Sequence, residues 1–534
     1  MMSNRFAGTS FLIGSLLRKN RIKIPIWILS IAFSVIFFGK LIPDMYTTGV
    51  DRQIMAETMK NPAVTVMLGP GYGLDNYNNG AMMAHFMLLF AAVASGMMGI
   101  LLTLPHTRED EEDGRTEMIR SLPVGSSSSL TAAISVSALS QLVLMLFVGW
   151  GLYFLKLEGM DFSGSMLYGA CLGAVGIFFS ALTGLFAQLM SNTRATSGAS
   201  FVFLITAYIV RGIGDVSSEA LSLISPLGLI LRSQVYVKNR WYPVWITLAL
   251  SLALFAVSLY LCSVRDLGAG FIATKPGRSK ASKLLTGPFG LSFRLLRTPF
   301  LAWAVGMFAL GAAYGSVLGD LEGFIESSEL VRQMIPEQEG LSMTEGFIAL
   351  IIAVLSILGA VPVLMFTLKL RNEEKKNRTE ALLSNAVSRR GVLGGYLLVA
   401  LLMSVTVQIM SALGLWSAAV AVMEEAVSLK TLITAALVHV PAIWLMSGLS
   451  LLLVGFFPNR TGFIWLYLTY AFFVIYMGDM LKLPEWTYRL SPFGYVPMIP
   501  ADEINFVTLL LLTFIAALFM FLGFIGYERR DLEG

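Results

Sequence analysis

Residues 346–368 read Gly346-Phe-Ile-Ala-Leu-Ile-Ile-Ala-Val-Leu-Ser-Ile-Leu-Gly-Ala-Val-Pro-Val-Leu-Met-Phe-Thr-Leu368, and no charged side chain interrupts them. A run of about 20 apolar residues is long enough to cross the hydrocarbon core of a bilayer as an α-helix. A segment in hydrocarbon must satisfy its own backbone hydrogen bonds, which a helix does. This stretch therefore predicts a membrane-spanning helix.

Comparable apolar runs recur along the whole chain. The 534 residues are 56% hydrophobic and 13% charged, with a mean hydropathy of +0.73, whereas soluble domains carry about twice that charged fraction. The runs predict an all-α polytopic membrane protein with about twelve transmembrane helices. We place them at 24–42, 81–104, 130–155, 164–190, 197–213, 244–263, 298–319, 346–369, 392–423, 431–457, 461–481 and 505–526.

The distribution of basic residues predicts the orientation. If the N-terminus lies inside, most of the 38 Lys and Arg residues fall in cytoplasmic segments, as the positive-inside rule requires. The basic stretch Arg18–Lys23 before the first span has the look of a signal peptide, but no small-residue cleavage site follows it. We expect a multi-pass protein of the cell membrane with both termini in the cytoplasm.

Composition also excludes several functional classes. The formal charge is only +4 and the basic residues sit at segment ends, which disfavours nucleic-acid binding. Cys171 and Cys262 lie inside apolar segments without CxxC or Cys/His companions, so we predict no metal site. Three dispersed histidines (His85, His106 and His439) do not form the cluster that a membrane hydrolase needs, and no catalytic residue is assigned.

Short landmarks recur at nearly constant spacing in the two halves of the chain. Arg115-Thr116-Glu117 returns 263 residues later as Arg378-Thr379-Glu380. Three further pairs are Asn192 and Asn459, Ser225-Pro226-Leu227-Gly228 and Ser491-Pro492-Phe493-Gly494, and Arg265-Asp266-Leu267 and Arg530-Asp531-Leu532. Because each half has the same even number of spans, they predict two parallel six-helix repeats. The expected divisions are 1–266 for the first half, 267–297 for a cytoplasmic linker with an interfacial helix, and 298–534 for the second half.

The segments 107–124 and 371–387 are dense in charge and then close with a few apolar residues. This pattern predicts a short amphipathic helix along the inner membrane face. A solvated loop is the plainer alternative. Because both segments keep Arg-Thr-Glu, we favour a docking element for a cytoplasmic partner.

The outer stretch Leu68-Gly-Pro-Gly-Tyr-Gly73 predicts a turn-rich loop, with a lid over an exit path as the alternative. No GxxxxGK[ST] motif occurs in the chain, so this protein has no phosphate loop and ATP must be bound elsewhere. Basic, apolar stretches before the first span of each half predict interfacial helices, which we interpret as anchors.

Few polar residues fall inside the predicted spans: His85, Gln141, Gln188, Gln408 and His439. They are candidates for a substrate path, although bonding between helices explains them equally well. No Asp or Glu lies clearly in the middle of a span, which disfavours a proton-driven antiporter.

Together these features resemble ABC-2 type permeases, and most of all the fused, double-length group of polyketide and polyether antibiotic exporters. The features are the two sets of six spans, the acidic-then-Arg-Thr-Glu loop after the second span, and Ser-Pro-x-Gly between the fifth and sixth spans. The resemblance implies that the charged loops are coupling helices for an ATPase and that the Ser-Pro-x-Gly segments are outer re-entrant helices. Carried over, the coupling residues are Glu112, Arg115, Glu117 and Arg120, then Glu374, Arg378 and Glu380; Leu383 stands where the second half would match Arg120. The re-entrant residues are Ser225, Pro226, Gly228, Ser491, Pro492 and Gly494.

The leading hypothesis is thus the permease of an ATP-driven exporter of a hydrophobic amphiphile. The chain itself would be no enzyme and hold no cofactor, while two copies of a separate ATPase would bind ATP and magnesium. The alternatives are a proton-coupled twelve-helix drug transporter and a membrane sensor or scaffold that transports nothing.

Overall fold

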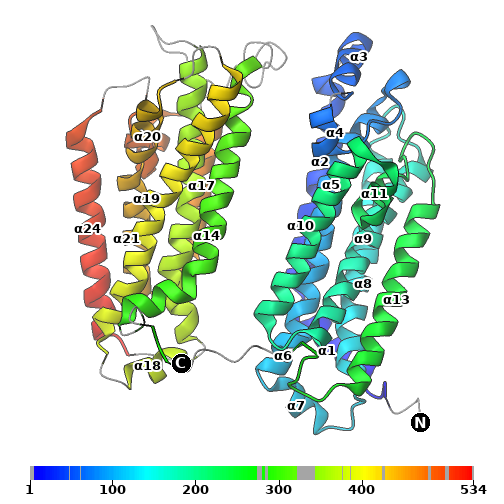
Figure 1. Ribbon diagram of the computed structural model, residues 1–534, viewed down its shortest axis with the longest axis horizontal. Coiled ribbons are helices and arrows are strands. Elements are labelled where there is room, and N and C mark those ends of the chain that lie inside the picture. Colours follow the sequence, from blue (N-terminus) through cyan, green and yellow to red (C-terminus); the bar gives the residue numbers. More distant parts are fainter. Residues whose placement is uncertain are drawn as a thin grey trace. The chain divides into compact units, whose positions relative to one another are not determined.

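The computed structural model describes the chain except for residues 1–4, 47, 61, 273–279, 283–284, 286, 321–342, 376, 385–386, 424–426, 479–482, 500–503 and 532–534. The described residues form helices and connecting turns (Figure 1). The chain forms two compact units, Met1–Pro276 and Gly277–Gly534. Residues 273–279, 283–284 and 286 of the predicted linker, among them Lys275, Arg278 and Lys283, lie outside the described residues.

The first unit contains thirteen α-helices and two 3₁₀ turns in its described residues. They are α1 (Thr9–Lys19), α2 (Lys23–Met45), α3 (Gly49–Thr58), α4 (Pro62–Leu68), η2 (Leu74–Asn76), α5 (Asn79–Thr103), η3 (Leu104–His106), α6 (Arg108–Glu112), α7 (Arg115–Arg120), α8 (Ser128–Phe154), α9 (Phe162–Leu189), α10 (Thr193–Ser217), α11 (Glu219–Ile224), α12 (Pro226–Leu231) and α13 (Tyr242–Val264).

The second unit is also helical in its described residues. Its described elements are α14 (Pro288–Gly315), η5 (Leu318–Asp320), α17 (Met343–Glu374), α18 (Arg378–Leu383), α19 (Arg389–Val422), α20 (Leu429–Leu437), α21 (Val440–Phe456), α22 (Phe463–Met477), α23 (Glu485–Arg489), η6 (Pro492–Tyr495) and α24 (Phe506–Arg529).

Eleven helices or helix pairs within the described residues are long and apolar enough to cross a membrane. Every predicted span overlaps one of them except 461–481, where α22 has only 15 residues and is shorter than a bilayer-crossing helix. The run predicted at 431–457 is interrupted between α20 and α21, because Pro441 in the first turn of α21 has no N–H to continue the helix. The all-α membrane fold is confirmed, and the described part of the chain provides eleven spans of sufficient length where the sequence predicted about twelve.

Each unit surrounds one central helix. In the most apolar part of α9, 83% of residues are buried, and in α17 the share is 89%. In the most apolar part of the outer helices α13 and α24, only 22% of residues are buried. These helices expose large apolar side chains such as Leu252 and Phe514. A helix that is apolar on every side and still exposed fits contact with lipid chains.

Glycine lets neighbouring spans approach each other closely. A Cβ at Gly99 of α5 would stand 2.3 Å from the carbonyl oxygen of Gly176 on α9. In the second unit, a Cβ at Gly311 of α14 would stand 2.1 Å from the carbonyl oxygen of Ser411 on α19. Small residues at such crossings are how membrane helices gain van der Waals contact without a hydrophobic driving force.

Candidate functional site

A buried ion-pair network closes the end of the first unit where α6 and α7 lie (Figure 1). Glu111 accepts from Arg108 at 3.1 Å and from Arg265 at 2.8 Å. Arg108 also donates to the backbone carbonyls of Ser191 at 2.6 Å and Gly268 at 3.0 Å. We call Arg108, Glu111 and Arg265 the first corner. It joins α6, the turn between α9 and α10, and the chain that follows α13.

The second unit repeats this network with the same residue types. Glu374 accepts from Arg371 at 3.3 Å and forms an ion pair with Arg530. Arg371 donates to the side-chain oxygen of Asn459 at 2.9 Å, in the turn between α21 and α22. Arg530 follows α24 and donates to the carbonyl of Val454 at 2.8 Å. Arg371, Glu374 and Arg530 form the second corner, and they lie 263 to 265 residues after their counterparts.

A short helix projects from each corner and carries Arg-Thr-Glu. Both helices begin after a residue in the left-handed conformation: Gly114 with φ 74° before α7, and Asn377 with φ 54° before α18. Glycine adopts this conformation without steric cost, and asparagine tolerates it better than most residues. The sharp break turns each short helix away from the preceding helix.

Within both short helices, the arginine folds back onto an acidic residue of the preceding helix. Arg115 lies 2.6 Å from Asp110, and Arg378 lies 3.3 Å from Glu373. The arginine side chains remain 48% and 59% exposed. The hydrogen bond that Arg115 donates to the Asp110 carboxylate raises the pKa of Arg115 above its ordinary value. The central threonines are buried and the glutamates are exposed, so each helix presents one arginine and one glutamate to the outside.

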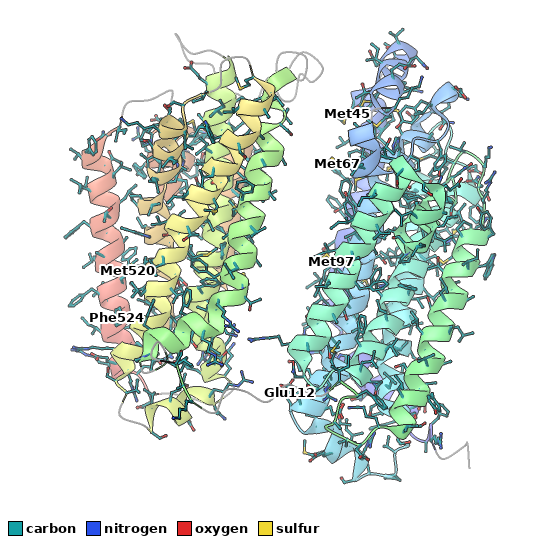
Figure 2. The ribbon with its side chains drawn as sticks, viewed as in Figure 1. Met45, Met67, Met97, Glu112, Met520 and Phe524 are labelled. Carbon is teal, nitrogen blue, oxygen red and sulfur yellow. The ribbon has the colours of Figure 1, made fainter. Side chains whose placement is uncertain are left out.

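The other predicted coupling residues differ in accessibility: Glu112 is exposed, Arg120 is partly buried and Glu374 is buried. Glu112 accepts a hydrogen bond from the backbone N–H of Thr193 at 3.0 Å, and Figure 2 labels it at the same end of the unit. Arg120 is partly buried and donates to the carbonyl of Ser126 at 3.2 Å. Glu374 is 3% exposed inside the second corner. It cannot offer its carboxylate to a partner while it binds Arg371 and Arg530.

Each Ser-Pro-x-Gly segment forms a short helix before the last span of its unit. Ser225 is the N-cap residue of α12 and Ser491 that of η6, and each hydroxyl accepts from the backbone N–H two residues later. Pro226 and Pro492 occupy the first helical positions, where a missing N–H costs nothing. A Cβ at Gly228 would stand 2.2 Å from a backbone oxygen, and one at Gly494 would stand 2.1 Å from one, so both sites require glycine.

At the opposite end of the first unit, side chains hold the end of α4. Arg211 of α10 donates to the carbonyl of Val66 at 2.8 Å, and Tyr208 donates to the carbonyl of Met67 at 2.8 Å. Met67 is labelled in Figure 2. The last carbonyls of a helix have no partner within it, so these donors act as a cap. Arg211 pairs with Asp215 at 3.2 Å, and both side chains are fully buried.

Sequence reasoning missed Arg211 and Asp215. The predicted span ended at residue 213, whereas α10 continues to Ser217. The signal was nevertheless present, because an arginine and an aspartate four residues apart share one face of a helix and can neutralise each other.

His85 belongs to the same end of the first unit. Its Nε2 lies 3.1 Å from the carbonyl oxygen of Gly69, and its Nδ1 lies 2.9 Å from the hydroxyl of Tyr77. It also lines a small pocket together with Pro70 and Tyr72 of the turn-rich loop. His85 thus connects that loop to α5.

The other polar residues predicted inside the spans form bonds within their own unit. Gln141 accepts from the hydroxyl of Ser95 at 2.8 Å, and Gln408 accepts from that of Ser356 at 3.1 Å. His439 lies 2.9 Å from the carbonyl oxygen of Ala435, one turn earlier. The bonds of Gln141 and Gln408 fit the interhelical alternative, whereas that of His439 is local to its own stretch of chain; a role of any of them in a substrate path stays a prediction.

No group of three or more His, Cys, Asp or Glu side chains within the described ranges is arranged to hold a metal ion.

Comparison with known proteins places the chain in a family. The family model described as "Multidrug efflux system permease Rv1217c, C-terminal domain" matches residues 12–261 and 285–528. The multidrug efflux system permease protein Rv1217c of Mycobacterium tuberculosis (strain ATCC 25618 / H37Rv) is 32% identical over 535 aligned residues, covering 99% of this chain and 96% of the relative. The chain belongs to the Rv1217c family of multidrug efflux system permeases.

The two ranges matched by the Rv1217c family description correspond to the two structural units. The first range contains α7 and the second contains α18. Each range therefore includes one exposed Arg-Thr-Glu helix and the Arg–Glu pair that supports it.

Proposed function

We propose that this Rv1217c-family chain is the membrane-spanning permease of an export pump energised by a separate ATP-hydrolysing subunit. In this proposal α7 and α18 are docking helices for that subunit. The observation that carries it is the recurrence of one construction in both units: an exposed Arg-Thr-Glu helix built on a buried Arg–Glu–Arg corner. The family membership adds support, because the relative's name describes an efflux permease.

The corners would transmit force from the docking helices to the spans. In the first unit, a displacement of α7 acts through Arg115 and Asp110 on α6, and Glu111 passes it to Arg265 beyond α13. Arg108 passes it to the turn before α10. Separating one partner of a buried ion pair leaves an uncompensated charge, which costs about 3–5 kcal/mol. The corner therefore moves as one piece.

The proposed topology puts both corners and both termini in the cytoplasm, where ATP is available. The positive-inside distribution of Lys and Arg supports this orientation. Two ATPase copies, one for each docking helix, would bind ATP and magnesium, and the permease would contribute no catalytic residue.

The proposed substrate is a hydrophobic amphiphile, such as a polyketide or polyether antibiotic. This class rests on the resemblance to double-length ABC-2 exporters, and the multidrug name of the relative is compatible with it.

The test is ATP-dependent transport in inverted membrane vesicles that contain the permease and its ATPase. Glu117→Arg and Glu380→Arg reverse charges on the exposed faces of α7 and α18 without removing a corner residue. We expect the double variant to lose most ATP-driven uptake of a fluorescent lipophilic drug and to lose co-purification of the ATPase. Glu158→Arg is the matched control, because Glu158 is an exposed glutamate in the turn between α8 and α9.

An uncoupler added with ATP separates this proposal from proton-driven transport. Uptake that continues after the proton gradient has collapsed supports the ATP-driven pump. Uptake that stops, or ATP hydrolysis by the purified permease alone, refutes the proposal.

A further inference from the structure

The first turns of α14 form one wall of a basic groove in the second unit. We define the groove by Lys280, Arg294 and Arg297 together with Leu285 and Phe293; Ala281, Ser282 and Gly290 complete its lining. It has an empty volume of about 1290 Å³, part of which is open to solvent. In Figure 1 these turns of α14 lie across the end of the unit where α18 is labelled.

Among the described residues, the three cations of the groove have no counter-charge. Each is exposed, and none forms an ion pair or a hydrogen bond with another described residue. The sequence contains no Asp or Glu between Asp266 and Asp320, so this stretch supplies no acid nearby. Lys19 before the first span differs, because its amino group lies 3.5 Å from Asp110.

Two of the cations lie on one face of a helix. Arg294 and Arg297 are three residues apart, which makes them neighbours on the surface of α14. Like charges at this spacing repel each other, and an anion bound between them removes that cost. Guanidinium groups bind phosphate through paired N–H donors, so the anion that fits best carries a phosphate.

An apolar wall accompanies the charges. Phe293 is 39% exposed and Leu285 lines the same groove. Pro299 lies inside α14 and cannot donate its backbone hydrogen bond, which favours a bend between these first turns and the rest of the span. If α14 crosses the bilayer, these first turns enter it at the level of the lipid headgroups.

We propose that this groove binds an anionic phospholipid, with the headgroup phosphate between Arg294, Arg297 and Lys280 and an acyl chain along Phe293. A free phosphate would use the cations but leave the apolar wall unused. An anionic lipid uses both, and its concentration in a membrane surface is high. The proposal does not depend on the ATPase or on the transported substrate.

Native mass spectrometry of the full-length protein in detergent tests the proposal. Phosphatidylglycerol and phosphatidylcholine with identical acyl chains are added in parallel. We expect retained phosphatidylglycerol adducts, and a loss of affinity of about tenfold or more in Arg294→Gln/Arg297→Gln, since each cation near a lipid surface contributes about 1 kcal/mol.

The control is Lys238→Gln/Arg240→Gln, which removes the same charge from exposed cations in the loop before α13. It should keep the wild-type adducts. Lys280→Gln lies outside the helix and provides a second, milder variant if the double variant aggregates; it should weaken binding by a smaller factor.

Three outcomes overturn the proposal. Equal retention of phosphatidylcholine would show that charge is not recognised. Displacement of the lipid by millimolar inorganic phosphate would show that the groove binds a free anion. Unchanged lipid adducts together with lost ATPase co-purification in Arg294→Gln/Arg297→Gln would assign the groove to a protein partner.

Discussion

Arg265 lies 2.8 Å from Glu111, 154 residues earlier in the chain, and both side chains are only 7% exposed. The pair ties the segment after the last span of the first unit to the helix that follows α5. Arg530 and Glu374 make the equivalent connection in the second unit. A buried contact between such distant parts of each unit gives the corner a structural role that is independent of any partner.

The first prediction concerns the stability of these corners. Glu374→Ala leaves Arg371 and Arg530 without their shared acid, and we expect a loss of about 3–5 kcal/mol in the free energy of unfolding. The control is Glu528→Ala, since Glu528 pairs with Arg390, whose side chain is 72% exposed; removal of such a pair costs at most about 1 kcal/mol. Denaturant titration in detergent, followed by tryptophan fluorescence, measures both. Equal losses would contradict the buried network.

The second prediction concerns the glycines of the two Ser-Pro-x-Gly segments. Gly228→Ala and Gly494→Ala each push a methyl group against a backbone oxygen, which cannot rotate away as a side chain can. We expect a loss of about 1–3 kcal/mol for each substitution. Gly198→Ala is the control, because nothing lies within 4 Å of its Cβ position in α10, and it should stabilise the helix by about 0.5–1 kcal/mol. A neutral Gly228→Ala would mean that α11 and α12 are less closely packed.

Hydropathy was sufficient to predict where the helices lie, because long apolar runs have few alternatives in a membrane. It failed at α22, whose sequence is as apolar as that of other spans although the helix ends after 15 residues. The end of a helix depends on the packing of the turn that follows it, and a hydropathy window does not contain that information.

Charge alone could not separate exposed from buried acids. Asp110, Glu111 and Glu112 are consecutive, and a helix turns by about 100° per residue, so each faces a different direction. In the structure Glu111 points into the first corner, whereas Glu112 is exposed and accepts a hydrogen bond from Thr193 at the start of α10. Glu374 corresponds in spacing to Glu111, which explains why it is buried although the sequence grouped it with docking residues.

The third prediction concerns the break before each Arg-Thr-Glu helix, α7 and α18. Gly114→Ala places a Cβ on a residue whose φ is 74°, which disfavours the left-handed backbone conformation. We expect the free energy of unfolding to fall by about 1–2 kcal/mol and α7 to change its direction relative to α6. Asn377→Gly relaxes the equivalent position and should be neutral or slightly stabilising for the native state. Unfolding measurements and ATP-driven uptake in vesicles check the pair. Loss of uptake in Asn377→Gly alone would contradict the equivalence of the two breaks.

The last prediction concerns the cap on α4. Asp215→Leu leaves the fully buried Arg211 without its acid, and we expect a loss of about 3–5 kcal/mol. Arg211→Met/Asp215→Leu removes both charges and should recover part of that loss, although the carbonyl of Val66 then lacks its donor. Arg232 keeps an acidic partner in both variants, because Glu219 lies 3.4 Å away.

Hydrogen exchange separates this electrostatic effect from the cap itself. The amides of α4 should exchange faster in the double variant, because the guanidinium that held the end of the helix is gone. Its unfolding free energy should nevertheless exceed that of Asp215→Leu. A double variant no more stable than Asp215→Leu would mean that the two charges do not compensate each other, and that Arg211 is held by the carbonyls of α4 alone.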